Sequence, residues 1–258
     1  MLQALSLVAQ GMYTDDLGAV SNAMSLVGID YYYIILVIPA MIIALIAQVK
    51  MQSAYKKYAK IGNSRGLTGE QAARMILNAH GLNYVPINMI AGELTDHFNP
   101  TDNTVNLSEA VYSGTSIASI GIAAHEVGHA IQHAEHYVPN KIRSAIIPVT
   151  NYGSRFSMIL ILAGLIFGQF IWLAYLGVIL YSTATLFQLV TLPVEFNASA
   201  RALKHIKELG IANDDNYKGV RKVLTAAAMT YVAALITSLA NLLRLFLIVR
   251  GSDSRNRR

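Results

Sequence analysis

Two histidines and a glutamate stand at the spacing of a helical zinc motif. The segment from His125 to His129 reads H-E-x-x-H, with Glu126 next to the first histidine. Four residues make just over one helical turn, so both imidazoles lie on one face and reach the same metal ion. A carboxylate beside them suits a general base acting on a metal-bound water. We therefore predict Zn²⁺ held by His125 and His129, with Glu126 as the catalytic base.

A catalytic zinc usually takes three protein ligands and a water, so one more ligand is needed. His133 and His136 continue along the same helix, and a rise of about 1.5 Å per residue carries them too far from His125. Glu135 falls where a metzincin would place its third histidine. The glycine that would turn the chain back there is Gln132 in this sequence.

The best candidate for the third ligand is Glu195, the first charge after a long charge-free run. An acidic side chain at that depth is costly unless it is paired or bound to a metal. Small residues at 198–202 would let its helix pack closely on the motif helix. Two alternatives stay open: a ligand from the loop at Asp96 or His97, and a Glu195 that is paired with a basic neighbour such as Arg201.

Local patterns predict the elements around the motif. The capping box at 68–71 begins a helix that ends at Gly81. Strands are expected at 83–90, where Pro86 favours a sheet edge, and at 104–107.

The motif helix itself can be capped by Thr115 or Ser116. We expect it to continue through His136 before Pro139 ends it.

The composition predicts a membrane protein with a soluble part. Hydrophobic residues make up 54% and charged residues 14%, against about 45–50% and about 25% in soluble domains. Residues 31–49, 156–194 and 223–243 contain no charge. A bilayer needs about 20 apolar helical residues, so the first and last runs each fit one span and the middle run fits a hairpin. Its turn is expected near Gly168 or between Trp172 and Gly177.

The predicted fold class is therefore mainly α. It is an integral membrane protein with about four transmembrane helices and a small zincin-like α+β cytoplasmic domain. The expected divisions are an extracytoplasmic segment 1–30, transmembrane helix 31–49, catalytic domain 50–155, transmembrane hairpin 156–194, third-ligand helix and cytoplasmic segment 195–222, transmembrane helix 223–249 and basic tail 250–258.

Charge placement predicts the orientation in the cell membrane. Residues 1–49 contain no Lys or Arg, whereas basic residues follow directly after the first span. By the positive-inside rule the N-terminus lies outside and the catalytic domain faces the cytoplasm. A full fourth span would place the basic tail outside. Either the last run does not fully cross, or the earlier loops dominate the orientation.

Several classes are excluded or not expected. Without cysteine there is no thiolate metal site and no cysteine nucleophile. The N-terminus lacks the basic region of a secretory signal peptide. Nucleic acid is not an expected partner, because the basic excess gathers beside the spans, where it meets anionic lipid. The expected partners are the lipid bilayer and a peptide or membrane-protein substrate. Oligomeric state and any membrane partner protein are not specified by the sequence.

Four segments resemble the YugP-like family of neutral membrane zinc metallopeptidases, of gluzincin type, and more distantly the HtpX-type proteases. They are Ala123–His133, Leu94–Pro100, Val105–Ser108 and Leu192–Arg201, and the resemblance spans about residues 30–250.

The resemblance implies that His125, His129 and Glu195 ligate zinc and that Glu126 is the base. It also implies that an extended substrate lies along the strand containing Thr104, Val105 and Asn106. Phe98 and Asn99 depart from the Tyr and Asp expected in many relatives, at no proposed ligand position.

The expected function is a membrane-anchored zinc-dependent endopeptidase. An additional donor should stabilise the tetrahedral oxyanion, and His97, Tyr137 and Arg201 are the candidates. Asp96 and Asn197 are candidate partners for the imidazole N–H groups of the ligands.

Two rival functions remain. In an intramembrane metalloprotease the motif would lie within a span. In a membrane scaffold or chaperone-like subunit the zinc would be structural and closed by a fourth ligand, with His97 the first candidate.

Overall fold

The computed structural model describes residues 30–256, which form two compact units. The first, here called the site unit, comprises residues 44–144 and 189–234. The second, the hairpin unit, comprises the described residues of 30–43, 145–188 and 235–256. Apart from Asp30, the expected extracytoplasmic segment lies outside the described residues, and so do the last two residues of the basic tail.

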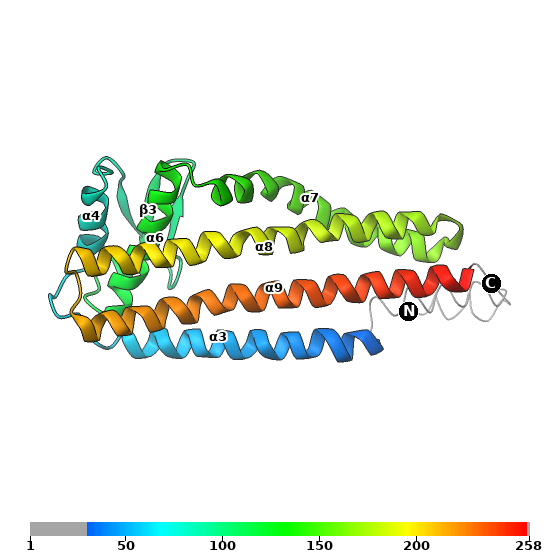
Figure 1. Cartoon of the computed structure of the whole chain (residues 1–258), viewed down its shortest axis with the longest axis horizontal. Helices are drawn as coiled ribbons and strands as arrows, with labels where there is room; N and C mark the ends of the chain where they lie inside the picture. Colours follow the sequence, from blue (N-terminus) through cyan, green and yellow to red (C-terminus); the bar gives the residue numbers. More distant parts are fainter. Residues whose placement is uncertain (1–29, 257–258) are drawn as a thin grey trace. The chain divides into compact units, whose positions relative to one another are not determined.

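Four long helices run through the chain, as Figure 1 shows. They are α3 (Ile38–Tyr58, preceded by the π-helical turn η1, Tyr33–Val37), α7 (Val138–Ile166), α8 (Ile171–Glu208) and α9 (Asp214–Asn256). Each contributes to a helical segment long and apolar enough to cross a membrane. The prediction of a mainly α membrane protein with about four spans is therefore confirmed. The basic tail is helical through Asn256, because α9 continues to that residue.

The hairpin unit contains the predicted pair of antiparallel helices. The chain turns at the short 3₁₀ helix η2 (Gly168–Phe170), so the first of the two predicted turn positions is correct. Helix α7 begins at Val138, well before residue 156. Near the turn, α7 and α8 pack closely at Gly164. A Cβ on this residue would lie 2.4 Å from the Ala174 nitrogen, so the contact requires glycine.

The site unit contains a three-stranded sheet with the order β1-β3-β2. Strand β1 (Ile87–Ile90) pairs parallel with β3 (Thr104–Ser108), and β2 (His97–Asn99) pairs antiparallel with it. Pro86 directly precedes β1, and the prediction of an edge strand there is confirmed.

The prediction that Thr104, Val105 and Asn106 form an open edge for substrate is wrong. Strand β3 is the central strand and all five of its residues are buried. Val105 is paired with Ile87 of β1, and Asn106 is paired with His97 of β2. Both edges of β3 are therefore paired, so its backbone has no free edge to which a peptide could add.

Helix ends follow the local signals. Helix α4 (Gly69–Ala79) has the predicted capping box at Thr68, and Gly81 takes the positive φ of +69° that suits glycine. Ser116 caps α6 (Ile117–Ala134) by accepting a hydrogen bond from the Ser119 N–H.

The predicted end of the motif helix is wrong in one respect. Helix α6 stops at Ala134 and His136 adopts a positive φ of 56°, so the chain has already turned before the proline. Pro139 instead lies in the first turn of α7, where its missing N–H leaves no helical acceptor unsatisfied.

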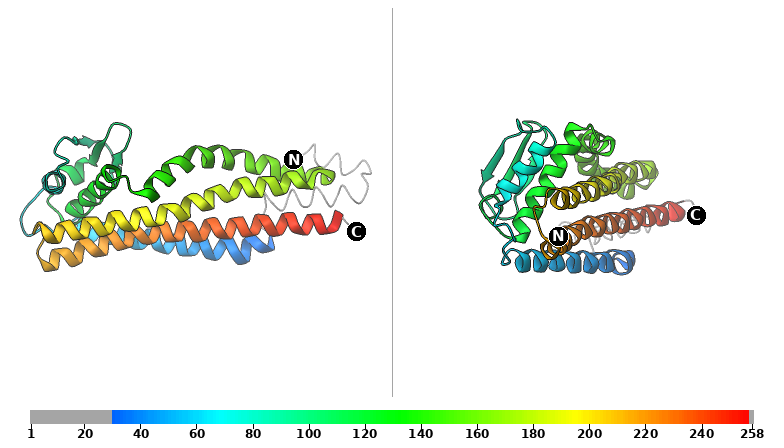
Figure 2. Two further views of the ribbon diagram at one scale, coloured as in Figure 1. Left: turned by 45° about the horizontal axis from the view of Figure 1, so that its top comes forward. Right: turned by 60° about the vertical axis from the view of Figure 1, so that its left-hand side comes forward.

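Helix α6 lies at the centre of the site unit. It packs on α4, on the short helix α5 (Glu109–Tyr112) and on the sheet. Figure 2 shows α4, α6 and the sheet gathered at one end of the long helices of this unit. Large side chains that are fully buried in this core include Ile76, Leu107, Ile120 and Ile131. At Gly128 helix α6 also meets α8, because a Cβ there would lie 2.6 Å from the Ala198 carbonyl oxygen. The predicted close packing of the small residues after Glu195 is thus confirmed.

The Gly128→Ala variant should destabilise the protein. The added methyl collides with the α8 backbone, which cannot rotate away as a side chain can, so we expect a loss of about 1–3 kcal/mol. Thermal unfolding in detergent measures the loss. Gly62→Ala is the matched control, because no atom lies within 4 Å of a Cβ at that position. Equal melting temperatures for Gly128→Ala and the control would contradict the close contact.

Candidate metal centre

His125 and His129 of α6 converge with Glu195 of α8 in the site unit. The Nε2 atoms of the two histidines lie 3.3 and 3.6 Å from Glu195 Oε2. One ligand atom from each residue lies within 4.8 Å of the other two, which is the arrangement of a group that can hold one metal ion. The two imidazoles come from successive turns of one helix, whereas the carboxylate arrives from a segment about seventy residues later in the chain.

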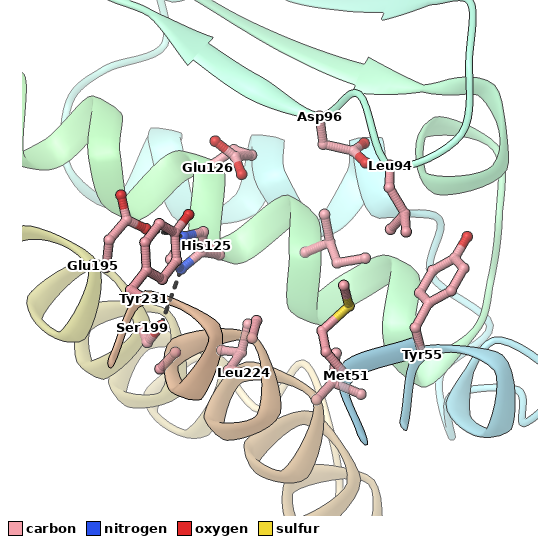
Figure 3. A pocket seen from close by; sticks show the side chains of 14 residues that line it. Met51, Tyr55, Leu94, Asp96, His125, Glu126, Glu195, Ser199, Leu224 and Tyr231 are labelled. Atoms are coloured by element: carbon pink, nitrogen blue, oxygen red, sulfur yellow. Dashed lines mark hydrogen bonds and ion pairs between the residues drawn. The ribbon is translucent and has the colours of Figure 1, made fainter. Parts of the chain in front are cut away.

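Each imidazole is oriented through its other ring nitrogen. His129 Nδ1 lies 3.0 Å from Gln132 Oε1, and His125 Nδ1 lies 3.1 Å from the Ser199 hydroxyl. Because an amide oxygen only accepts, His129 donates from Nδ1 and its Nε2 carries the lone pair that a metal requires. Figure 3 shows Ser199 beneath the His125 ring. Both Nε2 atoms are thereby directed at Glu195.

The amide of Gln132 links the two helices of the site. This side chain is completely buried, and its Nε2 donates to the Val194 carbonyl at 2.8 Å and to Asn197 Oδ1 at 2.9 Å. Both acceptors belong to α8 and flank Glu195. One side chain therefore orients an imidazole and fixes the backbone next to the carboxylate.

Glu195 is buried, with 2% of its surface exposed. Its Oε1 accepts a hydrogen bond from Arg143 at 3.2 Å, whereas Oε2 has no hydrogen-bond partner among the described residues. A buried carboxylate oxygen without a donor is unfavourable, and a cation placed between it and the two Nε2 atoms would satisfy all three. The donor set of two imidazoles and one carboxylate is one that zinc accepts.

The carboxylate also changes the titration of its neighbour. Burial alone would lower the pKa of His129, but the nearby carboxylates of Glu195 and Glu126 together outweigh it. The net effect is a pKa for His129 above its ordinary value. In the absence of metal, the site therefore attracts positive charge.

Glu126 lies beside the cluster and faces a cavity of about 160 Å³. Its Oε2 accepts a hydrogen bond from the Phe98 N–H of β2 at 3.0 Å. The same cavity is lined by His125 and Glu195 but not by β3. Edge strand β2 thus holds the carboxylate that the motif predicts as a base.

The remaining walls of this cavity come from α3, α9 and the loop before β2. Figure 3 shows Met51 and Tyr55 on α3, Leu224 and Tyr231 on α9, and Leu94 on the loop. Tyr231 lines this cavity together with His125 and Glu195. Helices counted as candidate spans therefore supply much of the apolar lining beside the zinc motif.

Neither of the predicted partners for the imidazole N–H groups fills that role. The Asp96 carboxylate accepts hydrogen bonds from the Ser108 N–H and hydroxyl, and burial raises its pKa. Asn197 contacts Gln132 and Arg201 and is one step removed from His129. The observed partners of the two Nδ1 atoms are instead Gln132 and Ser199, each one helical turn after a proposed ligand.

The three predicted oxyanion donors lie outside the cavity lining. His97 Nδ1 is 2.8 Å from the Thr95 carbonyl, and Arg201 binds Glu135 at 2.7 Å, an interaction that lowers the pKa of Glu135.

Tyr137, the third predicted donor, lines a different cavity. His133 and His136, which the helical rise already excluded as ligands, also line that second cavity.

Sequence reasoning missed Gln132, Arg143, Ser199 and Tyr231. Two of these, Gln132 and Ser199, could have been found from their spacing to a proposed ligand. Gln132 was noticed only as a missing glycine, although it lies one turn after His129, where side chains meet. Ser199 lies one turn after Glu195 in the same way. Arg143 and Tyr231 belong to other helices, and nothing in their local sequence indicates the site.

Comparisons with known proteins agree with this chemistry. Residues 33–250 match a family described as "Putative neutral zinc metallopeptidase". The chain is 47% identical over 222 residues to "Putative membrane protease YugP" of Bacillus subtilis (strain 168), covering 86% of this chain and 98% of that protein. No solved structure gives a significant match.

Replacing Gln132 by Met should weaken zinc binding about 10–100-fold, because His129 loses the acceptor that fixes its ring. Methionine keeps the length of the side chain and removes its polar atoms. A competition titration with a chromogenic zinc chelator measures the affinity. Gln71→Met, in the exposed capping box of α4, is the control and should leave the zinc affinity unchanged. Equal affinity for wild type and Gln132→Met would contradict this role.

Proposed function

The chain belongs to the family of putative neutral zinc metallopeptidases, and from this membership we propose that it is a membrane-bound, zinc-dependent endopeptidase. The observation that carries the proposal is the convergence of His125, His129 and Glu195, with an unpaired buried oxygen on Glu195 and the Glu126 carboxylate beside it. The substrate is a peptide or a segment of a membrane protein.

His125, His129 and Glu195 would hold the zinc ion. When bound there, zinc lowers the pKa of a water molecule and polarises the peptide carbonyl. Arg143 binds Glu195 Oε1 and leaves Oε2 directed toward the imidazoles. Among the described residues three side chains group as ligands, and a zinc ion held by three protein ligands would be able to take a water as well.

Glu126 is the general base in this proposal. The Phe98 N–H occupies its Oε2, so Oε1 is left to take the proton of the attacking water. As the water oxygen bonds to the carbonyl carbon, the electron pair moves onto the carbonyl oxygen. Glu126 then passes the proton to the amide nitrogen, and the C–N bond breaks to give a carboxylate and an amine.

We assign oxyanion stabilisation to Tyr231, in place of the three donors considered from the sequence. Its ring lines the catalytic cavity beside His125 and Glu195. A phenolic hydroxyl at this position can donate a hydrogen bond toward the negative charge that develops on the carbonyl oxygen.

The substrate would pair with edge strand β2. The Phe98 N–H of this strand points at Glu126 and not at β3, so the free edge of β2 faces the motif helix. An extended peptide added there would lie close to Glu126, with binding contributed mainly by backbone hydrogen bonds.

The two rival functions have less support. A structural zinc site needs a fourth ligand, and His97 instead lies 2.8 Å from the Thr95 carbonyl and 3.4 Å from the Asn106 amide nitrogen. An intramembrane protease needs its motif inside a span, and α6 is not among the described helices with the length and composition to cross a membrane.

We further propose that the catalytic domain faces the cytoplasm of a multi-pass cell-membrane protein. The support is the placement of Lys and Arg after the first span and their absence before it.

Glu126→Gln should retain zinc but lose peptide cleavage by at least about 100-fold, since the amide cannot take up the proton. Zinc content is measured by mass spectrometry and cleavage with a quenched fluorescent peptide library. Glu109→Gln, an exposed glutamate on α5, is the matched control and should cleave normally. Full activity of Glu126→Gln would exclude the proposed mechanism while leaving the metal centre intact.

Tyr231→Phe should lower kcat about 100-fold without loss of zinc, because only the hydroxyl is removed. The value of KM should change little, since the ring still lines the cavity. Tyr55→Phe, which removes a hydroxyl from the opposite wall, serves as the control and should leave kcat close to wild type. A kcat unchanged in Tyr231→Phe would remove this residue from the reaction.

A further inference from the structure

A second, larger cavity lies between α3 and α9 within the site unit. Its volume is about 550 Å³, and it is here called the cationic groove. Its lining comprises Ala47, Lys50, Lys218, Arg221, Lys222, Thr225, Ala226 and Met229. None of these residues lines the catalytic cavity, so the groove is a separate feature.

Four of the eight lining residues are cationic, and none is acidic. Lys218 forms an ion pair with Asp215 at 3.0 Å. Lys50, Arg221 and Lys222 are exposed and make no ion pair with any residue that the structure describes. Three uncompensated positive charges at one cavity favour an anionic ligand.

The lining of the groove changes from cationic to apolar along the two helices that form it. On α3, Lys50 directly follows the charge-free run 31–49, and Ala47 lies one turn inside that run. On α9, Lys222 directly precedes the charge-free run 223–243, and Ala226 and Met229 lie one and two turns inside it. Cations thus gather where each apolar run ends, and apolar lining continues within the runs.

The two helices are antiparallel, which brings these ends together. A Cβ on Gly219 of α9 would lie 2.9 Å from the ring of Tyr58, at the end of α3, whereas Lys50 and Ala47 share the groove with residues 225–229. Counted from this contact, Lys50 lies level with about residue 227 of α9, which is about 8 Å along the groove from the level of Lys222. A flexible lysine side chain can bridge that distance, so the four cations line one continuous stretch of the groove beside its apolar lining.

We propose that the cationic groove is a binding site for an anionic phospholipid. The phosphate lies among Lys50, Arg221 and Lys222, and an acyl chain runs along Ala47, Ala226 and Met229. A free phosphate would use only the cationic part. The groove combines a cationic end at the boundary of two apolar runs with an apolar floor, which is the polarity of a phospholipid. This site is independent of the proposed peptidase activity.

The test uses the full-length protein in phosphatidylcholine vesicles that contain a trace of spin-labelled phosphatidylglycerol or spin-labelled phosphatidylcholine. Electron paramagnetic resonance measures the fraction of each label whose motion the protein restricts. Wild type should restrict phosphatidylglycerol several-fold more than phosphatidylcholine. In Lys50→Gln/Lys222→Gln this preference should fall to near unity, and Lys50→Arg/Lys222→Arg should retain it.

Lys60→Gln/Lys207→Gln is the matched control, because it removes the same charge from two exposed lysines outside the groove. Its lipid preference should equal that of wild type. An equal loss in the control, or no preference in wild type, would overturn the proposal. So would displacement of phosphatidylglycerol by excess inorganic phosphate at constant ionic strength, since the site would then take phosphate alone. Monodisperse elution of each variant verifies its fold.

Discussion

The carboxylate of Glu195 is the constraint around which the site unit is arranged. It stands at the end of a 39-residue run without charge and is buried to 2% exposure. An isolated ion in such a place costs several kcal/mol, and that cost must be offset by nearby positive charge and hydrogen bonds. Arg143 supplies one contact, and the imidazoles of His125 and His129 face the remaining oxygen. A metal ion between them would complete the compensation. The same atom, Oε2, would then have its buried negative charge neutralised and serve as a metal ligand.

Close approach of two helices makes this compensation possible. Helix α6 and helix α8 meet at Gly128 and Ala198, where even one added methyl would collide with backbone. Gln132, one turn further along α6, then reaches the carbonyl of Val194 and so fixes the segment that carries Glu195. The small residues serve the metal centre indirectly. They set the helix separation at which two imidazoles on one helix and a carboxylate on another reach a common point.

The predictions that succeeded from sequence rest on local physics. The H-E-x-x-H spacing and the capping box at Thr68 are each determined within one helix, and the charge-free runs are read from consecutive residues. The strand order was not predicted correctly, because it depends on pairing between separate segments: β3 lies between β1 and β2, and all five of its residues are buried. The partners of the imidazoles were also missed: Asp96 and Asn197 were expected, and the structure instead places the Gln132 amide and the Ser199 hydroxyl at the two Nδ1 atoms. Arg143 and Tyr231 depend on how distant helices pack, which no local pattern encodes.

Helix α9 lines both cavities, and the residues that face each cavity repeat at helical intervals. Leu224, Ala227, Ala228 and Tyr231 line the catalytic cavity at intervals of three and four residues. Lys222, Thr225, Ala226 and Met229 line the cationic groove at the same intervals, displaced by two residues. Two residues correspond to about 200° around a helix, so the two sets lie on opposite faces of one rigid element. Helix α3 also lines both cavities, with Met51 and Tyr55 at the catalytic cavity and Ala47 and Lys50 at the groove, on neighbouring parts of its surface. Helices α3 and α9 therefore each contribute to the walls of both cavities, although no residue is shared between the two linings.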